Sequence, residues 1–154
     1  MADLLKYKDL VYEIIGSAMS VHSELGYGLL EPVYQEALHL ELLDRGIENV
    51  REQEIRIFYK THEKTYKMDI VVGDIIVELK SVSELISAHR SQLCNYLRLT
   101  KRPLGILINF EEESLVSERW AYNENTNNCY IVDRNMHRLP TTHNLLLNEQ
   151  LTNY

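Results

Sequence analysis

The stretch that decides the fold is Asp69-Ile-Val-Val-Gly73-Asp74-Ile-Ile-Val-Glu78-Leu-Lys80, in which apolar residues flank a glycine–aspartate pair. A two-residue loop of this kind predicts a β-hairpin, because glycine readily supplies the positive φ of a tight turn. Closing the hairpin sets Asp69 directly opposite Glu78. Side chains alternate along a strand, so Lys80 shares the face of Glu78. The other face is predicted to be wholly apolar, with Met68, Ile70, Val72, Ile75, Val77 and Leu79.

The facing carboxylates of Asp69 and Glu78 predict a metal site. Two carboxylates opposite each other in a hairpin lie roughly 5 Å apart at Cβ and repel each other. A cation between them explains why an otherwise apolar hairpin keeps the pair, and Lys80 adds a positive charge on the same face. This arrangement is typical of a catalytic site. The alternatives are a salt bridge of Lys80 to one of the acids and a solvent-facing acidic patch on an edge hairpin.

Length and composition indicate one soluble α/β domain covering residues 1–154. The chain has 45% hydrophobic and 25% charged residues, which is ordinary for a globular protein. No apolar stretch approaches the roughly 18 residues of a membrane span, and the N-terminus lacks a signal-peptide pattern, so we expect a cytoplasmic location and no membrane partner. The net charge of −7 argues mildly against a general nucleic-acid binder. Cys94 and Cys129 are expected to be buried apolar groups rather than a disulfide or a metal pair.

Hydrophobic periodicity predicts the element order α-α-β-β-β-α-β. Helices are expected at about residues 9–25, 31–46 and 85–100, and strands at about 49–60, 64–72, 75–81 and 104–110. The last strand follows a crossover helix, so it should lie parallel to its neighbour in a mixed four-stranded sheet flanked by helices. Residues 113–154 are expected to be a small extension of unknown role. Within it, 115–122 and 129–133 could form a further hairpin, and residues from about Pro140 onward read as a loosely held tail.

The chain resembles a known family at these positions. Asp69 followed by Glu78-Leu-Lys80 resembles the signature of the PD-(D/E)XK nuclease superfamily, and Gly28-Leu-Leu-Glu31-Pro-Val-Tyr34 resembles the motif of its GxxExxY branch. The segments 21–26, 92–97 and 104–110 also look similar, so the resemblance covers about residues 5–112. Met68 stands where the superfamily usually has proline. The resemblance implies a restriction-endonuclease-like core and metal-dependent phosphodiesterase activity.

The resemblance also implies a role for each site residue. Asp69 and Glu78 would bind Mg²⁺ or Mn²⁺, which prefer hard oxygen ligands, with Glu31 as a further metal contact. Lys80 would act on the attacking water and Gln92 would position it. Two tyrosines, Tyr34 and Tyr96, are candidates for supporting contacts.

Blander interpretations stay open for several of these residues. The position of Glu31 is also explained by the favourable meeting of a carboxylate with the positive end of its helix, and packing would equally explain Tyr34. His22 and His89 are more simply explained as helix histidines than as ligands. The basic residues Lys60, Lys64 and Lys67, and those between Arg90 and Arg102, are either phosphate contacts or solvated surface.

The predicted function is Mg²⁺-dependent hydrolysis of phosphodiester bonds in DNA, by a chain that could pair as a homodimer as many proteins of this architecture do. The alternative is an accessory module that retains the nuclease fold without catalysis and binds nucleic acid or a protein. The acidic charge favours the module, and the intact Asp69, Glu78 and Lys80 set favours the enzyme. Phosphate-loop, nucleophile-elbow and zinc-protease motifs are absent from the sequence.

Overall fold

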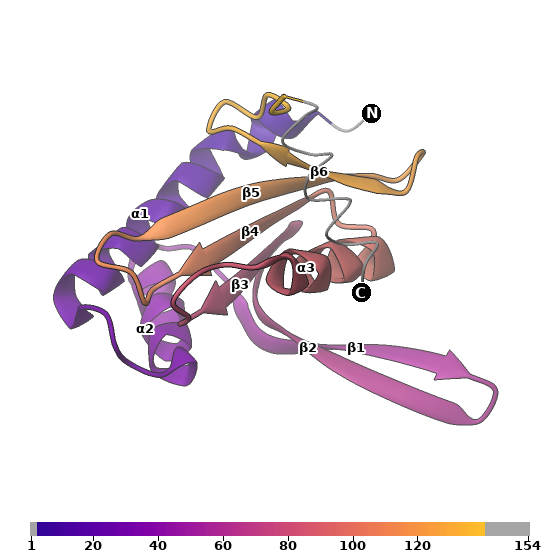
Figure 1. The fold of residues 1–154 in the computed structure, drawn as a ribbon, viewed down its shortest axis with the longest axis horizontal. Coiled ribbons are helices and arrows are strands. Elements are labelled where there is room, and N and C mark those ends of the chain that lie inside the picture. Colours follow the sequence, from indigo (N-terminus) through magenta and orange to yellow (C-terminus); the bar gives the residue numbers. More distant parts are fainter. Residues whose placement is uncertain (1–2, 141–154) are drawn as a thin grey trace.

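The computed structural model describes residues 3–140, in which helices cover both faces of a six-stranded sheet (Figure 1). The strands lie in chain order, from β1 to β6. A short 3₁₀ helix, η1 (Leu4–Tyr7), precedes the first long helix. The elements that follow are α1 (Lys8–Leu25), α2 (Glu31–Asp44), β1 (Val50–Tyr59), β2 (His62–Val72), β3 (Ile75–Lys80), α3 (Ser87–Thr100), β4 (Leu104–Asn109), β5 (Val116–Asn123) and β6 (Asn128–Val132).

The central hairpin forms with the predicted loop and register. Gly73 adopts a φ of 57° in the two-residue turn, the conformation that favours glycine there. The ladder pairs Val72 with Ile75 and continues for two more pairs, Val71–Ile76 and Ile70–Val77. It stops at that point, one pair short of Asp69 and Glu78. The strands separate where the two acids begin.

The predicted apolar face is wrong at Met68. Ile70, Val72, Ile75, Val77 and Leu79 join one core cluster, whereas Met68 packs with Val71 and Ile76 on the other side of the sheet. The strict alternation of side chains fails here because β2 leaves β3 after Ile70. The neighbouring strand is also distorted, since Glu52 has a φ of 51° and the ladder between β1 and β2 skips it.

The sheet is larger than the predicted four strands. β4 lies parallel to β3, as expected after the α3 crossover, and all other neighbouring strands are antiparallel. β5 and β6 then extend the sheet beyond β4, so residues 116–132 belong to the core rather than to an added extension. Trp120 is 1% exposed and Ala121 is fully buried. The predicted tail beyond Pro140 lies outside the described residues.

Two hydrophobic clusters hold the helices to the sheet. Ile14 and Ala18 of α1 and Leu38 of α2 pack on one face, and Leu93 and Leu97 of α3 pack on the other. Cys94 and Cys129 are both free and buried, as predicted. No helix in residues 3–140 is long and apolar enough to cross a membrane.

β1 and β2 project beyond the rest of the sheet as a two-stranded arm, residues 54–67 (Figure 1). Residues 58–67 are all exposed. The base of the arm lies next to the point where β2 separates from β3 and therefore borders the candidate site.

Candidate active site

Asp69 and Glu78 lie at the fork where β2 and β3 separate, and each carboxylate bonds to the other strand. The Asp69 amide donates to Glu78 Oε1 at 2.9 Å, and the Leu79 amide donates to Asp69 Oδ2 at 2.8 Å. These side-chain contacts replace the ladder hydrogen bonds that the separated strands no longer make. The fork therefore fixes both carboxylates on the backbone of rigid strands.

Glu78 is buried and Asp69 is partly buried. Glu78 is 2% exposed, and burial followed by the charge of Asp69 raises its pKa well above the ordinary value. Burial also raises the pKa of Asp69, although the Leu79 amide works against this shift. A buried carboxylate is unfavourable in its charged form unless a cation or hydrogen bonds compensate it. The fork therefore favours a bound cation.

The donor set fits a hard divalent ion that keeps part of its water shell. In residues 3–140, His, Cys, Asp and Glu side chains form no group of three or more that could hold a metal. Mg²⁺ commonly binds one or two carboxylates and completes its coordination with waters and substrate phosphates. Asp69 and Glu78 supply the two carboxylates that such an ion uses.

Lys80 extends from the same fork toward α3. Its ammonium donates to Gln92 Oε1 at 3.0 Å. Across residues 3–140 no ion pair joins Lys80 to a carboxylate, so the salt-bridge interpretation does not describe this geometry. The positive charge of Lys80 nevertheless lowers the pKa values of Glu31, Asp69 and Glu78. The lysine is thus near the acids but is held apart from them by Gln92.

Glu31 reaches the same site from the start of α2. Burial raises its pKa, the charge of Lys80 lowers it and the charge of Asp69 raises it. The three groups are therefore close enough to interact. Glu31 occupies the first turn of α2, where the free amides of the helix end also favour a negative charge.

One of three comparisons with known proteins shows the family of the chain. The sequence profile of the PD-(D/E)XK nuclease superfamily matches residues 8–120. The chain belongs to the PD-(D/E)XK nuclease superfamily. Comparison with curated proteins gave no match. A solved structure titled "Crystal structure of SSO0001" is similar with a TM-score of 0.48 and 18% identity, covering 79% of this chain and 64% of that one. The chain thus spans about 64% of the length of that relative.

Tyr34 supports the loop before Glu31. Its ring is fully buried and stacks on Phe110 with centroids 4.5 Å apart. Its hydroxyl donates to the Gly26 carbonyl at 2.6 Å and accepts from the Leu29 amide at 3.2 Å. These bonds fix the loop that leads into α2.

Gln35 is a site residue that the sequence predictions missed. Its amide donates to Asp69 Oδ1 at 3.4 Å, and its oxygen accepts from Arg51 Nε at 3.3 Å. The signal was present, because Gln35 follows Glu31 by four residues and therefore shares its helix face. The sequence alone did not show that this face meets β2.

Tyr96 lies one turn from Gln92 on α3, whereas the two histidines considered in the sequence, His22 and His89, make other contacts. Tyr96 is 4% exposed, and burial, with smaller contributions from the charges of Glu78 and Asp69, raises its pKa to about 12. His89 Nδ1 accepts from the Ile86 amide at 3.1 Å and caps α3. His22 Nε2 contacts the Glu112 carbonyl at 2.9 Å.

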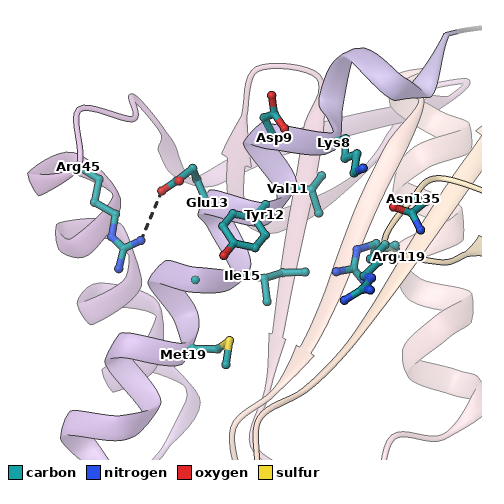
Figure 2. Close-up of a pocket in the computed structure, with 12 residues that line it drawn as sticks. Lys8, Asp9, Val11, Tyr12, Glu13, Ile15, Met19, Arg45, Arg119 and Asn135 are labelled. Atoms are coloured by element: carbon teal, nitrogen blue, oxygen red, sulfur yellow. Dashed lines mark hydrogen bonds and ion pairs between the residues drawn. The ribbon is translucent and has the colours of Figure 1, made fainter.

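A cavity of about 650 Å³ lies away from the fork, between α1 and β5 (Figure 2). It is lined by Tyr12 and Met19 of α1 and by Arg119, and an ion pair of 3.5 Å joins Arg45 to Glu13 at its edge. None of the predicted site residues lines it. If size alone decided, this cavity would be the candidate active site. We place the active site at the fork because two carboxylates, a lysine and an amide converge there.

Proposed function

We propose that this protein is a divalent-metal-dependent nuclease that hydrolyses phosphodiester bonds in DNA. The observation that carries the proposal is the fork itself, where a buried and a partly buried carboxylate accept hydrogen bonds from backbone amides and a lysine lies close by. Keeping such acids together without a cation is destabilising, as their raised pKa values indicate. Membership of a nuclease superfamily supports the same conclusion. The narrower GxxExxY assignment stays a prediction.

The proposed division of labour follows the geometry of the fork. Asp69 and Glu78 would hold Mg²⁺ or Mn²⁺, and Glu31, whose charge interacts with those of Asp69 and Lys80, would assist from the start of α2. The ion, when bound, lowers the pKa of an attacking water and stabilises the charge that develops on the phosphate. Lys80 orients that water and offsets negative charge in the transition state. Gln92 is a positioning residue, because its bond to Lys80 fixes where the ammonium points.

The arm supplies a surface for the nucleic-acid backbone. Lys60, Lys64 and Lys67 are exposed on it. The second basic stretch of the sequence is engaged within the protein instead: Arg90 pairs with Glu118 at 2.7 Å, and Arg102 donates to the Gly73 carbonyl at 3.2 Å. In a chain of net charge −7, the exposed lysines that run along the arm to Lys67, two residues from Asp69, are groups available to meet phosphates.

The test is cleavage of labelled DNA in Mg²⁺ and in Mn²⁺ by the wild type and by Lys80→Ala. Lys8→Ala, which removes an exposed lysine at the start of α1, is the matched control. We expect cleavage by the wild type and the control and a loss of at least about a hundredfold in Lys80→Ala. Equal cleavage by all three proteins would show that the activity arises elsewhere.

The accessory-module alternative is favoured by the acidic charge of the chain. It predicts nucleic-acid or protein binding without cleavage, and no dependence of that binding on Lys80. A stabilising effect of Mg²⁺ that requires Asp69 would argue against it, because a module without chemistry gains nothing from an occupied fork. The expected homodimer is checked separately by measuring the mass in solution.

A further inference from the structure

A second cavity, of about 260 Å³, adjoins the fork between α3 and the arm. Its lining consists of Tyr66, Ala88, Ser91, Gln92, Asn95 and Tyr96. Gln92 belongs to both places, since it lines this cavity and also holds the Lys80 ammonium at 3.0 Å. Whatever occupies the cavity therefore lies next to the group that would act on a scissile phosphate.

The cavity presents an exposed aromatic ring from the arm. Tyr66 is 37% exposed and tilts against the buried Tyr96, with the ring centroids 6.1 Å apart. Lys64, two residues along the same strand, places its ammonium 5.6 Å from the Tyr66 ring. An aromatic ring with a cation beside it can stack on a base while the cation contacts the adjoining phosphate.

The α3 wall of the cavity suits the edge of a base. Ala88 and Ser91 are small, so the helix leaves room between itself and Tyr66. Gln92 and Asn95 carry amides that can both donate and accept hydrogen bonds. An aromatic surface combined with amide groups is the chemistry by which proteins hold unstacked bases.

We propose that this cavity receives an unpaired nucleobase next to the scissile phosphate, so that the protein acts on single-stranded or frayed nucleic acid. A base inside a continuous duplex is stacked and paired, and it cannot enter such a cavity unless it leaves the helix. This inference rests on the proposed nuclease function for its position beside the reaction. Binding of the base can be measured without cleavage.

The experiment uses short strands that carry 2-aminopurine at successive positions, as single-stranded DNA, as single-stranded RNA and within a DNA duplex. Binding is measured in Mg²⁺ in the Lys80→Ala background, which keeps the substrate intact. Tyr66→Ala removes the ring, Tyr66→Phe restores it, and Asn95→Ala removes an amide from the α3 wall. The matched control is Tyr12→Ala, which removes an exposed tyrosine from the other cavity (Figure 2).

We expect fluorescence quenching at one position of the single strand and tighter binding of that strand than of the duplex. Tyr66→Ala should weaken binding of the single strand about tenfold, and Tyr66→Phe should recover most of the loss. Asn95→Ala should weaken binding of some bases more than others, whereas Tyr12→Ala should change nothing. Comparison of single-stranded RNA with single-stranded DNA shows whether the 2′-hydroxyl of the sugar changes the affinity.

Three outcomes separate this inference from the proposed function. Binding that depends on Tyr66, without cleavage by the otherwise wild-type protein, would support the base site and overturn the nuclease. Duplex cleavage that Tyr66→Ala leaves unchanged would support the nuclease and overturn the base site. Equal affinity of every variant for single strand and duplex would also overturn the base site.

Discussion

Asp69 is the residue on which metal binding should depend most directly. Asp69→Asn keeps the size of the side chain and an oxygen that can accept from Leu79, but it removes one charge from the fork. We expect its free energy of unfolding without metal to equal or exceed that of the wild type, because a buried charge is gone. Saturating Mg²⁺ should stabilise the wild type by about 2 to 3 kcal/mol and Asp69→Asn by far less. Thermal melts with and without Mg²⁺ measure both quantities.

The raised pKa values at the fork predict a pH dependence of stability. The folded protein holds protons on Asp69 and Glu78 at pH values where the unfolded chain, with ordinary pKa values of about 4, has lost them. The metal-free protein should therefore lose stability as the pH rises through this interval. Mg²⁺ displaces those protons, so the stabilisation that it gives should grow over the same range.

Melts between about pH 5 and pH 8, with and without Mg²⁺, test this dependence. Glu78→Gln should flatten the metal-free profile, because it removes the more deeply buried acid. A metal-free stability that rises with pH at the same slope in wild type and Glu78→Gln would contradict the assignment of the shift to the fork.

At the scale of single residues, the sequence was informative where chemistry depends on local order. The two-residue turn and the register from Val72–Ile75 to Ile70–Val77 follow from the hairpin pattern, whereas the predicted direct pairing of Asp69 with Glu78 does not form because the strands separate there. Gln35 was missed because its contact with Asp69 requires α2 to lie on β2. Met68 was placed on the wrong face because nothing in the local pattern indicates that β2 separates from β3.

At the scale of elements, β5 shows why the predicted sheet was too small. The sequence suggested a further hairpin here but left its place in the fold open, and Glu118 is largely buried because it pairs with Arg90 of α3. The side chains of Arg90 and Glu118 are 17% and 15% exposed and lie 2.7 Å apart, and Trp120 Nε1 also donates to Glu118 at 3.0 Å. Because these charged residues pair in a largely buried position, a hydrophobicity pattern alone does not identify β5 as a strand of the central sheet.

This ion pair should couple α3 to β5 measurably. Arg90→Ala leaves Glu118 buried without its partner, so we expect a loss of about 2 to 3 kcal/mol in the free energy of unfolding. Arg90→Met combined with Glu118→Leu should lose less than Arg90→Ala alone, because neither charge is left unpaired. Urea unfolding followed by the fluorescence of Trp120, the single tryptophan, measures both. Arg56→Ala, on the exposed arm, is the control and should change stability by less than about 0.5 kcal/mol.

At the scale of the whole molecule, the acidic net charge and the proposed nucleic-acid substrate are compatible only if cations are concentrated locally. The three exposed lysines of the arm provide that concentration along its length, from Lys60 in the turn at its tip through Lys64 to Lys67, two residues from Asp69. Removing three positive charges far from the arm should change only the long-range repulsion between the protein and the nucleic acid. Removing the three arm lysines should change this repulsion and also remove phosphate contacts. The two effects can be separated because direct contacts release counterions and therefore alter the salt dependence of binding.

The triple variant Lys60→Gln, Lys64→Gln, Lys67→Gln should weaken binding and flatten the plot of log affinity against log salt. If each lysine meets one phosphate of a single strand, the slope should change by about 2, since each contact contributes roughly 0.7. The control changes Lys6, Lys8 and Arg134 to glutamine, which alters the net charge equally on the side of the molecule that carries α1. Binding titrations at several salt concentrations should show a change in slope for the arm variant only. Equal changes for both variants would mean that total charge governs binding and that the arm makes no specific contact.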